Sequence, residues 1–132
     1  GITVYQRQTT DATPTTISTM SNSSGDTLRL VTLPNNSAYG FTITLVAAVT
    51  GGGNSSMWKY QGLIKRGANA GSTAIVGSVV KDRIAYDSGA SAWDADAAAD
   101  TTNGSLKITV TGQASTTIRW LARIETTELT YS

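Results

Sequence analysis

Apolar side chains alternate with glycine and threonine through the segment 39–49, and this is the strongest pattern in the chain. Every second position is apolar, and Gly40, Thr42 and Thr44 lie between them; the apolar set is Tyr39, Phe41, Ile43, Leu45, Ala47 and Val49. Successive side chains of a β-strand point to opposite faces, so the pattern predicts a strand with one buried and one hydrated face. Half-buried strands of this kind are typical of antiparallel sheets. The segment therefore favours an all-β fold.

Similar strand signals recur along the chain at the spacing of β-hairpins. Glycines at 51–53 and the Asn103-Gly104 pair are typical turn residues between such strands. The predicted strands cover 2–7, 15–20, 27–33, 39–49, 58–65, 73–86, a short stretch at Trp93, 106–110 and 116–130. About eight or nine strands predict an antiparallel β-sandwich that is jelly-roll-like. The alanine-rich segment 92–100 is the one rival helical signal, but it lacks an apolar stripe, so we expect a strand and a loop there.

The length of the chain fits one domain with one core, spanning 1–132. Position 1 is glycine and not methionine. Two explanations stay open: an initiator methionine has been removed from a small complete protein, or the chain is the C-terminal part of a longer one.

The residue types that are missing exclude several kinds of chemistry. The chain has no histidine and no cysteine, which excludes a histidine general base, a serine–histidine triad and a cysteine zinc site. The formal net charge is +1, which gives no reason to expect nucleic acid or an acidic membrane as partner. No apolar run is long enough to insert into a membrane. We therefore expect a protein that is not an enzyme and that uses no cofactor.

Three aspartates form the best candidate for chemistry that remains. Asp94 and Asp96 are two residues apart, so on a strand their side chains share a face, and Asp100 follows. A carboxylate pair can act as acid and base in a glycosidase. Together with Asn103, the three aspartates could also hold a calcium ion, which prefers oxygen ligands. The sequence favours a simpler role for them, as turn-forming aspartates of a hydrated loop.

The tryptophan beside these aspartates is a candidate for ligand contact. Trp58 and Trp120 fall in the buried phase of their strands, whereas Trp93 is the tryptophan that we expect to be most exposed. An exposed indole ring next to polar groups can stack on a sugar. Trp93, Asp94 and Asp96 are therefore the predicted contacts to a glycan or a receptor.

The outward face of the last predicted strand carries residues that are typical of subunit interfaces. Arg119 and Arg123 alternate there with Leu121, and Leu129 follows further along. Arginine often pairs across interfaces, and several apolar residues on one hydrated face indicate a partner. Val31 and Leu33 are predicted to face outward on an earlier strand in the same way. A small basic set lies on neighbouring predicted strands: Lys65, Arg66, Lys81 and Arg83.

Six short segments of the sequence are distinctive as a set: LPNNSAY at 33–39, GLIKR at 62–66, AADTTNG at 98–104, ITVTG at 108–112, TIRW at 117–120 and TTELT at 126–130. In their order and spacing, these segments resemble a module at the C-terminal end of tailed-bacteriophage structural proteins of the tail-fibre or tailspike type. The resemblance implies a virion protein, assembled in the host cytoplasm and trimeric as most fibre tips are. It implies no catalytic residues.

Three functions follow from these observations. The leading one is a homotrimeric attachment module whose loops contact a glycan or a protein of the host surface. The second is a capsid decoration, or cement, protein that clamps neighbouring capsid subunits. The third is a carboxylate-based glycan hydrolase in which Asp94 and Asp96 are the catalytic pair.

Overall fold

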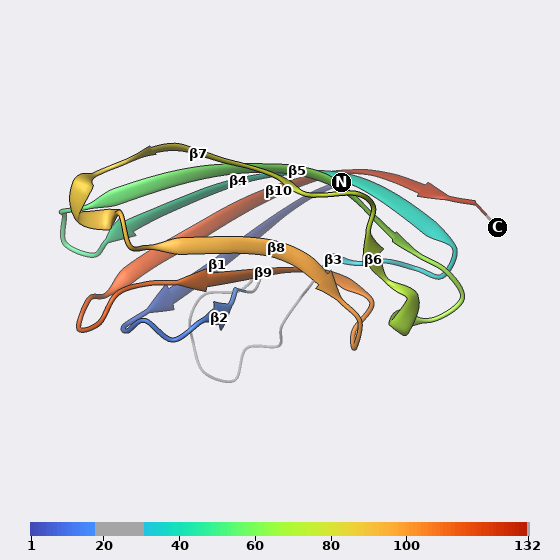
Figure 1. Ribbon diagram of the computed structural model, residues 1–132, viewed down its shortest axis with the longest axis horizontal. Coiled ribbons are helices and arrows are strands. Elements are labelled where there is room, and N and C mark those ends of the chain that lie inside the picture. The colour runs from blue at the N-terminus through green and yellow to red at the C-terminus, as the bar shows by residue number, and fades with distance from the viewer. Residues whose placement is uncertain (18–30, 132) are drawn as a thin grey trace.

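The computed structural model describes residues 1–17 and 31–131 (Figure 1). Within these ranges the chain forms ten strands and two short 3-10 helices, η1 (Ala70–Ser72) and η2 (Ser88–Ala90). The strands are β1 (Ile2–Thr9), β2 (Thr15–Thr16), β3 (Val31–Thr32), β4 (Ser37–Val49), β5 (Ser55–Arg66), β6 (Ala74–Ile75), β7 (Val80–Tyr86), β8 (Asp94–Asp100), β9 (Ser105–Thr111) and β10 (Ile118–Thr130). The described residues contain no helix that is long and apolar enough to cross a membrane.

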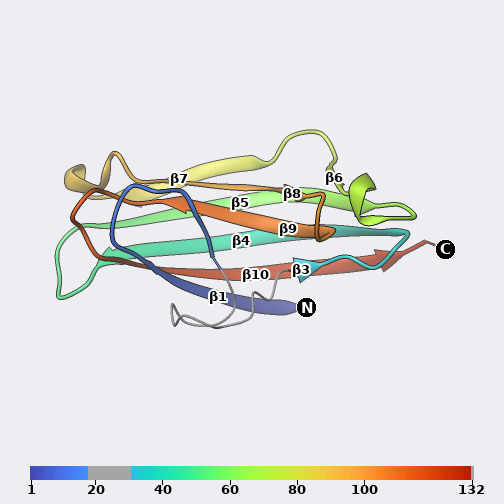
Figure 2. The same cartoon turned by 90° about the horizontal axis from the view of Figure 1, so that it is seen from below.

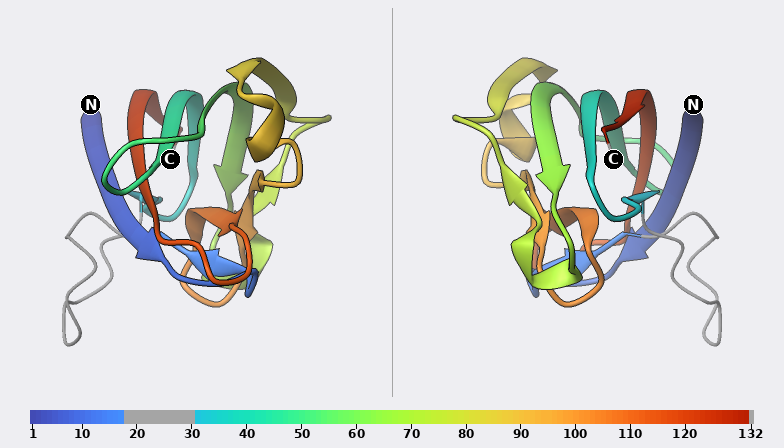
Figure 3. Two further views of the ribbon diagram at one scale, coloured as in Figure 1. Left: turned by 90° about the vertical axis from the view of Figure 1, so that its left-hand side faces the viewer. Right: turned by 90° about the vertical axis from the view of Figure 1, so that its right-hand side faces the viewer.

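The strands form two antiparallel sheets that face each other. The long sheet has the order β1-β10-β4-β5, and both β6 and β7 pair with β5. In the short sheet, β9 pairs with β2, β3 and β8. Seen end-on, the long sheet curves over the short one (Figure 3). The predicted antiparallel β-sandwich is confirmed.

The core lies between the two sheets and follows the alternation of the sequence. Every second residue of β4 is buried from Ser37 to Ala47, and the same holds for β10 from Ile118 to Ile124. The short sheet contributes Leu106, Ile108 and Val110 from β9, which are fully buried. The buried apolar side chains form one cluster. The predicted inward faces of these three strands are therefore confirmed.

Three tryptophans lie together in the middle of this core. The rings of Trp58 and Trp120 stack with centroids 5.7 Å apart and an angle of 24° between their planes. Trp93 packs against Trp120 at 6.1 Å. Such aromatic pairs contribute about 0.5–1.5 kcal/mol beyond the area that they bury. The cluster joins β5 and β10 of the long sheet to the residue that precedes β8 of the short sheet.

The hairpin between β8 and β9 requires glycine at position 104. Gly104 has a φ of +68°, a left-handed conformation that favours glycine. A Cβ atom at this position would also lie 2.1 Å from Nη1 of Arg66. Arg66 donates from Nη1 to the carbonyl of Leu33, and the N–H of Leu33 donates to the carbonyl of Gly104. The predicted Asn-Gly turn thus also holds one end of the sandwich together.

The fold differs from the sequence prediction in three places. The segment 92–100, predicted as a short strand at Trp93 followed by a loop, instead contains the seven-residue strand β8, which begins after Trp93. The segment 73–86 divides into β6 and β7, with a left-handed residue, Gly77, between them. The outward orientation predicted for Val31 and Leu33 is wrong, because Leu33 is 1% exposed and Val31 packs against the core. The described part of β3 is too short to repeat the alternation, and a shift of one residue reverses the faces of a strand. The other residues predicted as strand in this part of the chain, 18–20 and 27–30, lie outside the described residues.

Candidate functional site

Trp93 is buried, so the prediction that it is the exposed tryptophan is wrong. Its side chain is 2% exposed, and its Nε1 donates a hydrogen bond of 3.0 Å to Oε1 of Gln113. The sequence did contain a signal for this burial. Trp93 is in phase with the buried Ala95, and the exposed Asp94 and Asp96 occupy the alternate positions. A ring in this position has no face available to stack on a sugar.

Asp94 and Asp96 are exposed on one face of β8, so they belong to a strand and not to the predicted hydrated loop, and they share a lysine of the other sheet. Nζ of Lys81 on β7 lies 2.6 Å from Oδ1 of Asp94 and 3.0 Å from Oδ1 of Asp96. Desolvation opposes ionisation of Asp94, but the hydrogen bonds from Lys81 and from the N–H of Ala95 outweigh it, so the pKa of Asp94 is lowered. The same pair of carboxylates raises the pKa of Lys81 despite its desolvation. This ion-pair cluster joins the two sheets along one side of the sandwich.

Asp100 lies at the far end of the same strand and has a different role. Its carboxylate accepts hydrogen bonds from the N–H groups of Thr102 and Asn103 and from Nδ2 of Asn103. The bond from the Asn103 side chain is the main cause of its lowered pKa. It lies six positions further along the strand than Asp94, a distance of about 20 Å. Among the described residues, no three acidic side chains gather in a way that could hold a metal ion.

Arg83, a second cation of β7, packs along the same side of the sandwich. The guanidinium of Arg83 lies 3.8 Å from the ring centroid of Tyr86 and 4.8 Å from that of Trp58. It donates to the carbonyls of Ala90 and Ser91 and to the buried hydroxyl of Ser56. Sequence reasoning placed Lys81 and Arg83 in one basic set but did not find these partners. The contacts depend on how the two sheets are stacked, which no local pattern records.

No described strand or helix covers the outer face of the long sheet. In Figure 1 the short sheet lies below the long sheet, and no labelled strand lies above it. Figure 2 shows the molecule from the side of the short sheet, with the strands of both sheets running along the long axis. The predicted interface residues of β10 lie on the outer face of the long sheet: Arg119, Leu121, Arg123 and Leu129 are all exposed. Leu121 is 46% and Leu129 is 62% exposed.

Neighbouring strands extend this face around Leu121. In register, Leu121 lies beside Val46 of β4, which lies beside Met57 of β5, which lies beside Ala85 of β7. We call these four residues the apolar row. Val46 is 44% exposed. Sequence reasoning found only the member on β10, because the row runs across strands that are far apart in the sequence.

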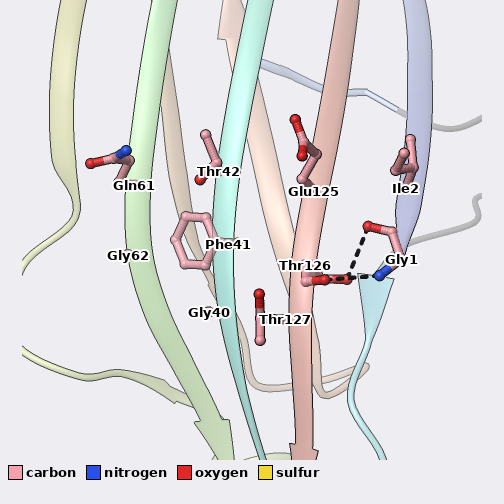
Figure 4. Close-up of a pocket in the computed structure, with 10 residues that line it drawn as sticks. All are labelled: Gly1, Ile2, Gly40, Phe41, Thr42, Gln61, Gly62, Glu125, Thr126 and Thr127. Carbon is pink, nitrogen blue, oxygen red and sulfur yellow. Dashed lines mark hydrogen bonds between the residues drawn. The ribbon is translucent and has the colours of Figure 1, made fainter.

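A polar hollow lies on the same sheet, towards the end at which β1 begins (Figure 4). Its volume is about 650 Å³. It opens where Gly40 has no side chain, since a Cβ atom there would meet nothing closer than 4.0 Å. The hydroxyl, amide and carboxylate groups that surround it belong to Thr42, Gln61, Glu125 and Thr127.

No known protein-family model matches the chain, and no curated protein is significantly similar to it in sequence.

Proposed function

We propose that the chain is a non-enzymatic structural module of a bacteriophage virion, of the tail-fibre or tailspike type, and that it acts by presenting surfaces. The observation that carries this proposal is the outer face of the long sheet, which no described element covers. Aliphatic side chains from several strands lie exposed on it, including Leu121 and Val46. Exposed apolar groups that are contiguous across a surface mark sites of association. Such a face is expected of a module that assembles with other chains.

The state of the carboxylates also supports a role without catalysis. A glycosidase needs one carboxyl group that stays protonated at working pH, with its pKa raised. The pKa of Asp94 is instead lowered, and the Lys81 ammonium stands between Asp94 and Asp96. Asp94 is therefore suited to an ion pair between the sheets and not to the acid role of a glycosidase.

In the proposed assembly, three copies surround a common axis and the loops between strands remain exposed. Each copy then carries the same loops to one host surface, so that weak single contacts to a glycan or a protein act together. Asp94 and Asp96 remain candidates for such contacts, because both are exposed. Trp93 is not a candidate, because it is buried.

Immunogold electron microscopy tests the proposal. Antibodies raised against the purified chain would be applied to intact particles of the phage whose genome encodes it. We expect gold at the tail or its fibres, and serum depleted with the purified chain is the control. Gold spread over the capsid would contradict the tail module and support a cement protein instead. Intact particles that bind no gold would overturn the virion role.

An adsorption assay tests the attachment part of the proposal. Purified chain added before the phage is expected to slow adsorption to host cells, whereas heat-denatured chain has no effect. Adsorption that is unchanged at saturating chain would exclude a receptor-binding role. Release of sugar from host polysaccharide by the purified chain, and its loss in the double variant Asp94→Asn with Asp96→Asn, would contradict the non-enzymatic proposal.

A further inference from the structure

We propose that the outer face of the long sheet packs against the same face of further copies of this chain, with the apolar row at the centre of the contact. This inference deepens the assembly role proposed above and rests on it. It assigns the interface to the face of the whole sheet, whereas the sequence pointed only to the outward side of one strand.

The apolar row is continuous across four neighbouring strands. Leu121, Val46 and Met57 are partners in register, so their side chains stand next to each other on the same face. Cross-strand neighbours of this kind lie about 4.5–5.5 Å apart at their Cβ atoms. Val4 of β1, 44% exposed, extends the apolar surface diagonally beside Leu121. The row is thus one surface and not a set of separate exposed side chains.

The charges beside the row are of both signs, which suits contact between identical faces. Arg123 forms an ion pair with Glu125 on the same strand. Lys59 of β5 lies beside Asp82 of β7 in register. A second copy presents the same mixture, so Glu125 and Asp82 of one copy can meet cations of the other as the copies approach. A face with only one sign of charge would repel its own copy.

The size of the face matches what a stable interface needs. β4, β5 and β10 contain 13, 12 and 13 residues, which at about 3.3 Å per residue gives a length of about 40 Å. Five strands side by side, about 4.8 Å apart, make the face about 24 Å wide. Because β1 and β7 are shorter, with 8 and 7 residues, the resulting area is on the order of 800 Å², close to the roughly 800 Å² that each partner buries in a stable complex.

The edge strand β7 is protected against the other common mode of self-association, in which two sheets join edge to edge. Lys81 and Arg83 point inward from this strand. Asp94 and Asp96 hold Lys81, and the carbonyls of Ala90 and Ser91 at the end of η2 hold Arg83. Inward-pointing charges on an edge strand are a known device against pairing with another chain. At this side of the sandwich, a further copy therefore meets the face of the sheet more readily than its edge.

Analytical ultracentrifugation of the 13.7 kDa chain and of lysine variants tests the interface. At about 100 µM we expect the wild type to sediment as more than one copy. Val46→Lys and Leu121→Lys should each weaken association by about tenfold or more, since they place a charge in the contact. Val76→Lys is the matched control, because Val76 is 40% exposed but lies outside the row. A wild type that is monomeric at this concentration would overturn the inference, and so would folded row variants that associate as the wild type does.

Cross-linking locates the contact by a second route. The chain has no cysteine, so Val46→Cys creates a single thiol on the row and Val76→Cys a single thiol away from it. A short bis-maleimide is expected to join copies of the first variant and not of the second. Equal cross-linking of the two variants would contradict the assigned face.

The association measurements and the particle-labelling experiment test the interface and the virion role separately. A chain that is monomeric but labels phage tails would overturn the interface and leave the virion role standing. A chain that associates through the row but labels no particle would overturn the virion role and leave the interface standing.

Discussion

Trp120 donates a hydrogen bond of 2.9 Å from its indole Nε1 to Oγ1 of Thr9, which lies 111 residues earlier in the chain. Both side chains are buried, at 0% and 5% exposure. The bond therefore gives a polar atom in the middle of the aromatic cluster its partner, and it joins β1 to β10 through side chains as well as through the backbone.

Removing the acceptor of this bond is expected to destabilise the fold. Thr9→Val keeps the shape of the side chain but leaves the indole N–H of Trp120 buried without a partner. Such a loss costs about 1–3 kcal/mol of unfolding free energy. Urea unfolding followed by tryptophan fluorescence measures it, and Thr10→Val, at an exposed neighbouring position, is the control. Equal stability of the two variants would show that the bond contributes nothing.

Two glycines on neighbouring strands should respond differently to the same substitution. A Cβ atom at Gly62 would lie 2.6 Å from Cζ of Phe41, whereas at Gly40 it would lie 4.0 Å from Cβ of Thr127. Gly62→Ala must displace a buried ring, which costs about 1–3 kcal/mol. Gly40→Ala should be neutral or stabilise by up to about 1 kcal/mol, because alanine restricts the unfolded chain. Thermal unfolding of both variants checks the contrast, and a tolerant Gly62 would mean that the ring can move aside at little cost.

The stacked guanidinium of Arg83 is expected to be irreplaceable by lysine. Lysine keeps the charge but loses the flat group that lies against Tyr86 and Trp58 and donates to several acceptors. Arg83→Lys should lower the unfolding free energy by about 1–2 kcal/mol. Arg119→Lys, on the exposed outer face, should leave it unchanged. Chemical denaturation compares the two, and equal effects would contradict the stacking role.

The ion-pair cluster of Lys81 with Asp94 and Asp96 should make stability depend on pH in acid. The pKa of Asp94 is lowered in the fold, so its contribution is present above the unfolded pKa of about 3.9 and is lost as pH falls through the folded value. The pKa of Lys81 is raised, so its contribution is present below the unfolded pKa of about 10.4 and is lost as pH rises through the folded value. Because these side chains are partly hydrated, the total is at most about 1 kcal/mol.

Lys81→Gln isolates this effect. Between about pH 5 and pH 9 the variant should be less stable than the wild type, and the difference should vanish towards about pH 2. Denaturant unfolding across this range measures the difference, and Lys65→Gln on the exposed outer face is the control. A difference that persists unchanged at pH 2 would mean that Lys81 stabilises the fold by packing and not by charge.

Local alternation was enough to predict the strands and their buried faces where the strands are long. Ile43 and Trp120 are each inside a run of 13 residues, so the phase of burial repeats several times. The predicted phase is wrong at Leu33, where the hydrophobic and polar residues of 31–33 do not repeat over enough positions to define a face. Around Trp93 the sequence carries two opposing signals. Trp93 is in phase with Ala95, which indicates burial, whereas the adjacent Asp94 and Asp96 indicate exposure.

The contacts between the sheets could not be predicted in the same way. Lys81 meets Asp94 only because β7 and β8 lie along the same side of the sandwich, although they belong to different sheets. The apolar row has the same origin, since Leu121 and Val46 become neighbours only when β10 pairs with β4. A single sequence records which side chains a strand exposes, but not which strands are adjacent.

The pairing of β1 with β10 also determines how the domain would respond to a pulling force. The strands are antiparallel, with Ile2 beside Glu125 and Thr9 beside Ile118, so the start of β1 lies next to the later part of β10. In Figure 2, β1 begins to the right of the middle of the molecule, beside the part of β10 that leads towards its end. Tension applied between the two ends would load the β1–β10 hydrogen bonds one after another, as in a zipper, and not all at once in shear. β1 would therefore detach first under load, while the long β4, β5 and β10 strands remain paired.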